Sequence, residues 1–336
     1  MIELVKNLCA IDGTSGNEDN VRNYISEKLD ALGVEYKIDN LGNILGKKTA
    51  KYKSDKNIML AAHMDEVGMM ITSICDDGSL KFGTVGGISS EALIGKTVRI
   101  NGIGGVIGSK AVHNMTASEK SASINADNLY IDIGAQTKEN AIALVNLGDC
   151  AYFDSDATDF GDNLLIGKAI DDRAGCAIIL KLIEKSDYSF SFAFTVQEEV
   201  GTRGAGVAAY TINPDIAFVL EATTAADIPS ASGADRVCEV NKGAVISFMD
   251  RSTIYDKGLY NTALEISKQQ GIKCQVKSRI AGGNDSGAIH KAAGGVKCLA
   301  ISVPCRYLHS GVCVSSVDDI YSSYELCSAM LKALSE

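Results

Sequence analysis

The chain has 336 residues, of which 46% are hydrophobic and 22% are charged, so it is long enough to bury a substantial core and to form two domains. Its formal net charge of −10, without any run of lysine or arginine, argues against a nucleic-acid-binding surface. No segment approaches the roughly 18 apolar residues of a membrane span, and the beginning, MIELVKNLCAIDG, has no signal-peptide pattern. We therefore expect a cytoplasmic protein.

The chain contains ten cysteines, and no two of them form a C-x-x-C pair. Several, such as Cys176 and Cys298, lie inside apolar runs. We interpret them as small buried residues in a reducing compartment, and neither as disulfides nor as a zinc knuckle.

Residues 1–66 predict helices followed by strands. Apolar residues every three or four positions predict a helix over residues 15–32, with Ser15 and Glu18 as a capping box and Gly33 at its end. A strand pair is expected around residues 35–46. The apolar run at residues 58–62 predicts a buried parallel strand that stops at His63.

Residues 67–162 differ from the segments before and after them. Glycine is dense there, and turn signals such as Asp77-Gly78 separate short alternating runs. This pattern is typical of a small β-rich domain, a barrel or a sandwich, with one helix near residues 138–145. We expect residues 67–162 to be a domain inserted into a single α/β domain made of residues 1–66 and 163–336.

From residue 164 onward, strands and helices alternate. Strands are expected to end at Asp171, at Glu198 and at Glu221, and a last strand over residues 296–303 leads to His309. Ser316 is expected to cap a C-terminal helix. The alternation predicts a three-layer α/β/α domain with a mostly parallel sheet.

Six polar residues therefore stand at or just past the predicted carboxyl ends of core strands: His63, Asp171, Glu198, Glu199, Glu221 and His309. In open α/β sheets, ligand sites form at that edge. Imidazole and carboxylate groups are the ligand set for zinc, cobalt or manganese. Each residue alone has an ordinary structural explanation, such as a buried histidine or a helix cap, but the six together predict a metal site.

The charges of this set suit two ions. Two divalent cations carry +4, and three ligand carboxylates with one bridging hydroxide carry −4. One carboxylate is then left over, and a two-metal hydrolase needs such a group as general base. The remaining histidines, His113 in the insertion and His290 in a predicted helix, are assigned no role.

The segments AHMDEVG, GKAIDDRAG, VQEEVGTRGAG, LEATTAADIP, GGNDSGAI and RYLHS occur in this order and resemble the tetrahedral aminopeptidase family. This family includes glutamyl and deblocking aminopeptidases, and some members have been labelled endoglucanases. The resemblance covers essentially the whole chain. It implies a zinc-peptidase-like fold in which the inserted β-rich domain serves dimerisation and flanks the active site as a lid.

The resemblance also implies a role for each residue at the strand ends. One divalent ion would be held by His63 and Glu221, the other by Glu199 and His309, and Asp171 would bridge them. The catalytic residues would be Glu198, as general base, and Asp65, which orients His63. Zinc and cobalt are expected before manganese.

These expectations describe a dinuclear aminopeptidase that hydrolyses N-terminal residues from small peptides through a metal-bridging hydroxide. The family resemblance implies a homo-oligomer, with dimers building a dodecamer, and neither nucleic acid nor membrane is an expected partner. Alternatives are a metal-dependent deacylase of small N-acyl amino acids, a glycosidase, and a non-catalytic binding protein. The histidines and the absence of tryptophan count against the glycosidase. No motif indicates the preferred N-terminal residue.

Overall fold

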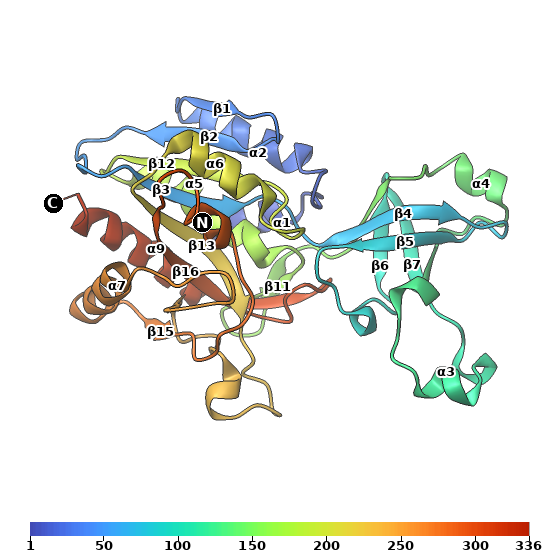
Figure 1. The fold of residues 1–336 in the computed structure, drawn as a ribbon. Helices are drawn as coiled ribbons and strands as arrows, with labels where there is room; N and C mark the ends of the chain where they lie inside the picture. Colours follow the sequence, from blue (N-terminus) through green and yellow to red (C-terminus); the bar gives the residue numbers. More distant parts are fainter. Residues whose placement is uncertain (336) are drawn as a thin grey trace.

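The computed structural model describes residues 1–335 and contains a large mixed sheet and a separate closed barrel (Figure 1). Helices cover both faces of the large sheet, and the barrel projects from one end of it. The expected α/β fold with a small β-barrel is therefore confirmed.

The centre of the large sheet is parallel and its edges are antiparallel. The four central strands run in the order β12, β3, β13 and β16, and all three pairs between them are parallel. The strands outside them on this path pair antiparallel, so the sheet is mixed. The strands of the path, from one edge to the other, are β1 (Tyr36–Ile38), β2 (Ile44–Lys48), β12 (Phe190–Thr195), β3 (Ile58–His63), β13 (Ile216–Thr224), β16 (Lys297–Arg306), β17 (Cys313–Ser316), β11 (Leu164–Gly167) and β10 (Thr158–Phe160). Two short parallel strands, β14 (Ala244–Ile246) and β15 (Cys274–Val276), are attached through β14 to β16.

Apolar cores on the two faces of the sheet hold the helices in place. One face packs against α1 (Ile2–Cys9), α2 (Asp19–Ala31), α5 (Ile170–Lys185), α7 (Lys257–Gln270) and α9 (Val317–Ala333). The other packs against α6 (Arg203–Ile212) and α8 (Ser286–Ile289). Alternation along β12 places Phe190, Phe192 and Phe194 in the first core and Ala193 in the second, as its sequence predicts.

The barrel is closed by six antiparallel strands around its own apolar core. In order around the barrel they are β4 (Gly68–Ile74), β5 (Leu80–Val85), β8 (Tyr130–Asp132), β7 (Ile103–Gly108), β6 (Thr97–Ile100) and β9 (Cys150–Phe153). Its short helices are α3 (Ala117–Ser121) and α4 (Lys138–Ile142), with 3-10 turns at Ser90–Ala92, Val112–Asn114 and Ala126–Asn128. The chain rejoins the large sheet at β10, a few residues before the predicted boundary at residue 162.

Charged side chains fill the junction between barrel and sheet. Lys168 Nζ lies 2.6 Å from Asp12 Oδ1 and 2.9 Å from Glu66 Oε1, and its side chain is almost fully buried. Arg173 also pairs with Glu66, at 3.4 Å. From the barrel, Arg99 pairs with the same Asp12 oxygen at 3.1 Å. Asp12 is therefore shared between the two parts of the molecule.

The predicted capping box at the start of α2 is wrong. Ser15 Oγ instead donates to Asp65 Oδ2 at 2.6 Å. Glu18 is the N-cap residue but makes no capping bond with its side chain, and its Oε1 accepts from the backbone N–H of Gln197. The partners of both side chains, Asp65 and Gln197, lie just past the ends of β3 and β12 and are distant in the chain, so a local sequence pattern does not include them.

Two expectations about composition are met. All ten cysteines are free and eight of them are buried, as interpreted from their apolar surroundings. Among residues 1–335, no helix has the length and apolar character needed to cross a membrane.

Candidate metal centre

The candidate site lies where β3 and β12 end side by side. His63 is the last residue of β3 and is paired in register with Thr195, the last residue of β12. On the other side of β3, the parallel strand β13 brings Glu221 close to the carboxyl end of β3, where His63 lies. The prediction that this strand ends at Glu221 is wrong, because β13 stays paired with β16 through Thr224.

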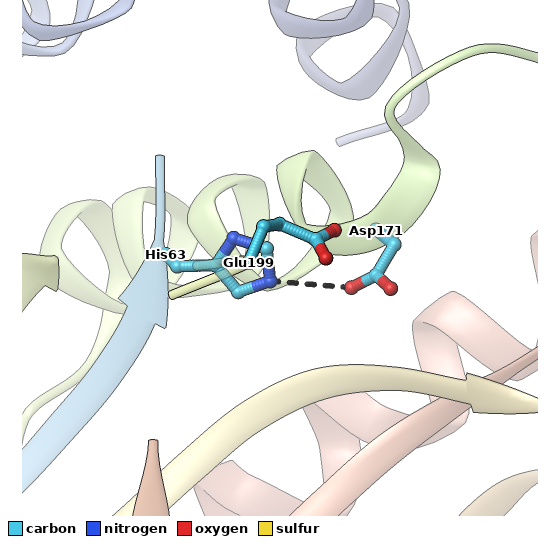
Figure 2. Close-up of side chains that lie close together, drawn as sticks. All are labelled: His63, Asp171 and Glu199. Atoms are coloured by element: carbon cyan, nitrogen blue, oxygen red, sulfur yellow. Dashed lines mark ion pairs between the residues drawn. The ribbon is translucent and has the colours of Figure 1, made fainter. Parts of the chain in front are cut away.

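Asp171 reaches the site from a helix and not from a strand. The strand predicted before it ends earlier, at Gly167, and Asp171 lies in the first turn of α5 with φ −81° and ψ 109°, outside the helical region. The peptide bond between Asp171 and Asp172 is cis. Figure 2 shows the Asp171 carboxylate beside the His63 ring, with Glu199 next to them.

The candidate ligands form two groups that meet at Asp171. In the first, the His63 half, His63 Nε2 lies 3.3 Å from Asp171 Oδ1 and 3.4 Å from Glu221 Oε1. In the second, the His309 half, His309 Nε2 lies 3.6 Å from Asp171 Oδ2 and 3.3 Å from Glu199 Oε2. Each oxygen of Asp171 therefore faces a different histidine.

Backbone carbonyl groups orient both imidazole rings. Nδ1 of His63 lies 3.0 Å from the carbonyl oxygen of Asp65, and Nδ1 of His309 lies 3.1 Å from that of Gly87. Since a carbonyl oxygen only accepts, Nδ1 donates in both rings, and a neutral ring then offers Nε2 to a cation. Gly87 follows β5, so the inserted segment holds one of the two rings.

Asp65 also fixes the backbone of the glutamate pair. Its Oδ1 accepts from the N–H of Glu198 at 3.0 Å and its Oδ2 from that of Glu199 at 3.1 Å. The side chain of Glu199 is 4% exposed and faces His309. The side chain of Glu198 lines the adjoining cleft and has no hydrogen bond or ion pair with a described residue. Adjacent residues thus occupy different environments.

Burial and mutual repulsion disturb the pKa values of the carboxyl groups. Burial, followed by neighbouring charges, raises the pKa of Glu198 and of Glu221 well above the usual range. Burial and the Asp171 carboxylate raise the pKa of Glu199 to about 7. Without a cation, burial and mutual repulsion therefore favour the protonated form of these carboxyl groups, and Glu199 is partly protonated near pH 7.

The neighbouring carboxylates raise the pKa values of both histidines. Burial alone would lower the pKa of His63, but Glu221, Asp171 and Asp65 outweigh it, and the pKa lies well above its usual value. The hydrogen bond with Asp171 raises the pKa of His309 to about 10. The same interactions lower the pKa of Asp171 despite its burial.

The donor set fits divalent cations. Two candidate groups, one of His63, Asp171 and Glu199 and one of His63, Asp172 and Glu221, have ligand atoms within 4.8 Å of one another. Asp171 Oδ1 and Glu221 Oε2 are buried without a hydrogen-bond partner among the described residues. A buried carboxylate oxygen without a donor is costly unless a cation neutralises it.

Asp172 supports the site and is not a ligand in our interpretation. Its Oδ2 accepts from the backbone N–H of His63 at 3.3 Å, and its Oδ1 accepts from that of Gly175 at 2.9 Å. These bonds occupy both oxygens and connect α5 to the end of β3. Neither of the two groups coincides with one of the halves defined above, since both contain His63. We prefer the halves because they rest on ion-pair distances that also include His309.

Sequence analysis missed a further buried acid, Asp285. Its Oδ2 accepts from Thr195 Oγ1 at 2.5 Å, and its Oδ1 has no partner among the described residues. Burial raises its pKa to about 6. Asp285 lies in GGNDSGAI, one of the segments that carry the family resemblance. Its place in that segment could have indicated it as a site residue. His113 is exposed, and His290 Nδ1 contacts Ser286 O, so neither joins the site.

A cleft of about 490 Å³ opens beside the two halves. Asp171, Glu198, Glu221 and His309 line it from the centre. The inserted segment contributes Gly87, Ser89 and Ala92, and the side away from it includes Asp250, Tyr255 and Lys277. A sheet with a parallel centre, and with histidines and carboxylates beside a cleft where the central strands end, is the arrangement typical of a metal-dependent hydrolase.

Comparison with known proteins identifies the family to which the chain belongs. The profile of the M42 glutamyl aminopeptidase family matches residues 42–326, and the chain belongs to this family of metallopeptidases. A relative from Acetivibrio thermocellus is 41% identical over 97% of each chain. The glutamyl aminopeptidase of Lactococcus lactis is 32% identical, covering 99% of this chain and 96% of that one.

Two further relatives differ in name from these. The lysyl aminopeptidase of Pyrococcus furiosus is 30% identical, over 99% of this chain and 97% of its own. The structure of the TET1 peptidase of Pyrococcus horikoshii, described as assembling into a tetrahedron or a large octahedral shell, is 32% identical with a TM-score of 0.85, over 98% of each chain. The protein is thus an aminopeptidase of a family whose named members differ in side-chain preference.

Proposed function

We propose that this aminopeptidase is dinuclear and removes N-terminal residues from small peptides, with Glu198 as general base. The observation that carries the proposal is the position of Asp171, whose two oxygens face His63 and His309 separately. A carboxylate placed in this way suits a bridging ligand between two cations.

In this proposal His63, Glu221 and Asp171 would hold one ion, and His309, Glu199 and Asp171 the other. The ions, zinc or cobalt before manganese, would supply Lewis acidity toward the scissile carbonyl and toward the attacking water, and would bind the free N-terminal amine. Asp65 and the Gly87 carbonyl keep the two Nε2 atoms directed at the carboxylates.

Glu198 moves the proton. Its side chain faces the cleft, where substrate lies, and no cation of the chain pairs with it among the described residues. Burial raises its pKa from the usual value for glutamate, which strengthens it as a base for the attacking water. The proton then passes from Glu198 to the leaving amine.

Assembly is part of the proposal. The TET1 peptidase of Pyrococcus horikoshii forms closed shells, and we propose that this chain builds dimers through the inserted barrel and dodecamers from the dimers. Residues 67–162 would then be the dimerisation and lid domain, and residues 1–66 with 163–336 the catalytic domain of a cytoplasmic enzyme. Light scattering of metal-loaded protein tests it, and a monomer mass at every concentration would contradict it.

The decisive experiment uses metal-stripped protein refilled with zinc, cobalt or manganese. Hydrolysis of amino-acyl p-nitroanilides is measured, with N-acetyl amino acids and a soluble glucan as alternative substrates. We expect turnover of the amino-acyl substrates only after refilling. Turnover of N-acetyl amino acids alone would instead identify a deacylase, and turnover of the glucan alone a glycosidase. Activity equal before and after stripping would contradict the metal dependence.

A further inference from the structure

The turn that carries the glutamate pair is held by side chains from other parts of the molecule. Beyond the end of β12, the four consecutive backbone N–H groups of residues 196–199 all donate to side-chain oxygens. In chain order, the acceptors are Asn43 Oδ1, Glu18 Oε1, Asp65 Oδ1 and Asp65 Oδ2, at 3.0, 3.1, 3.0 and 3.1 Å. These N–H groups are therefore satisfied by distant side chains and not by a neighbouring strand.

Gln197, the second residue of this turn, has an unfavourable backbone conformation. Its φ is 57°, in the left-handed region that residues other than glycine rarely adopt. Such a conformation persists only where the surroundings fix it. The carbonyl oxygen of Gln197 accepts from the N–H of Arg203 at 3.1 Å, and its N–H donates to Glu18. Since Glu198 follows directly, the direction of its side chain depends on how Gln197 is held.

The carboxylate of Glu18 is fixed in place for this contact. Only 3% of Glu18 is exposed, and its Oε1 also accepts from the N–H of Gly16 at 2.8 Å. Although Glu18 is the N-cap residue of α2, its side chain makes no capping bond with that helix. The side chain therefore connects the loop before α2 to the turn after β12, and its removal takes no cap from α2.

We propose that Glu18 is a positioning residue for the general base: it holds Gln197 in the left-handed conformation that directs Glu198 into the cleft. This inference rests on the proposed function, because Glu18 acts on the reaction only through Glu198. The N–H of Glu199 remains bonded to Asp65, so the metal ligand of the pair does not depend on Glu18.

The test measures kcat, KM and metal content of the metal-loaded enzyme on Leu-p-nitroanilide. Glu18→Ala should lower kcat by about tenfold to a hundredfold, the range for a slightly misplaced catalytic group. KM and the content of both ions should be unchanged, because Glu198 is not a ligand. Glu18→Gln should keep kcat within about threefold of wild type, since the amide oxygen can accept from both N–H groups. Glu27→Ala, at an exposed position of α2, is the matched control and should behave as wild type.

A double variant separates positioning from a general structural role. In the Glu198→Gln background, Glu18→Ala should cause no further loss of the residual kcat, because the group that Glu18 positions no longer accepts a proton. A structural defect that acts elsewhere would instead lower kcat by the same factor in both backgrounds.

A second replacement serves if Glu18→Ala does not fold. Glu18→Asp keeps the charge and retracts the oxygens by one methylene group, so the bond to Gln197 is lost or lengthened. It should give the same selective loss of kcat, with KM and metal content unchanged.

The outcomes distinguish the two claims. Wild-type kcat in both Glu18→Ala and Glu18→Asp, a Glu18→Gln variant as impaired as Glu18→Ala, or a further tenfold loss in the double variant overturns the role of Glu18 and leaves the proposed function standing. Wild-type kcat in Glu198→Gln contradicts the general base of the proposed function and this inference with it.

Discussion

The two halves of the candidate centre are built differently. His63 ends a central strand, is 2% exposed, and is oriented by Asp65, its neighbour in the chain. His309 lies in the loop after β16 with a positive φ of 56°, is 38% exposed, and is oriented by Gly87 from the inserted segment. The His63 half therefore lies entirely within the part of the chain that builds the large sheet and its helices, whereas a ring of the His309 half is held by the inserted segment.

This contrast suggests unequal affinities. The His63 half has its backbone fixed by strand pairing and by Asp172, so little conformational freedom is lost when an ion binds. The His309 half must hold a loop residue in an unfavourable backbone conformation. We expect the first ion to occupy the His63 half and the second, weaker ion the His309 half.

The largest effect is expected from Glu198, which belongs to neither half. Glu198→Gln should keep both ions and reduce kcat by about a hundredfold to ten-thousandfold, because an amide cannot accept the proton. Glu199→Gln, the matched change at the next residue, should lose the weaker ion. Metal content and kcat are measured on both variants. Equal loss of metal in the two would contradict the division of roles.

Histidine replacements test the halves directly. His309→Ala should bind one ion with nearly wild-type affinity and weaken the other by more than about a hundredfold, since it removes a ligand and not merely its support. His63→Ala should weaken both ions, because it removes a proposed ligand of one ion and a contact of Asp171, the carboxylate that both ions would share. Calorimetric titration with zinc gives both affinities. Identical binding curves for the two variants would remove the distinction between the halves.

Asp65 supports the His63 half and the glutamate pair together. Asp65→Asn replaces one acceptor oxygen by an amide donor, so it cannot keep all the bonds from Ser15, Glu198 and Glu199. We expect a loss of about tenfold to a hundredfold in kcat/KM, the range for groups that orient ligands. Asp77→Asn, in an exposed turn of the barrel, is the control. An unchanged kcat/KM would show that the backbone of Glu198 and Glu199 does not need the hydrogen bonds to Asp65.

The smallest effect is a pH dependence of metal affinity. The pKa values of Glu199 and His309 are raised to about 7 and about 10, so both groups hold protons in the metal-free protein near neutral pH. A cation must displace these protons, and its affinity should therefore rise as pH increases through 7 toward 10. Titrations in buffers of different ionisation enthalpy count the protons released. Binding without proton release would contradict these pKa shifts.

The sequence indicated most of the candidate site because His63 and the glutamate pair follow apolar runs whose strands end where the runs end. The predicted strand ends at Asp171, Glu198 and Glu221 were wrong, since β11 ends at Gly167, β12 at Thr195 and β13 at Thr224. A strand paired along its length by β16 continues past an acidic residue, and Asp171 follows an antiparallel strand that ends early. Periodicity records local burial but not the length of the neighbouring strand.

Residues whose role depends on long-range contacts were not predictable from local patterns. In the sequence, Gly87 is one of many glycines in the insertion. Its carbonyl oxygen accepts from the His309 ring because the loop after β16 lies against it. Ser15 was misinterpreted for the same reason, since Asp65 lies 50 residues away.

The contact between His309 and Gly87 makes one ring a reporter of domain orientation. The junction that holds the barrel includes the ion pairs of Lys168 with Asp12 and Glu66. A rotation of the barrel would move the Gly87 carbonyl, which accepts from Nδ1 of His309, and would therefore change the environment of that ring. The nitrogen NMR chemical shifts of this single histidine would therefore follow the hinge angle of the whole molecule.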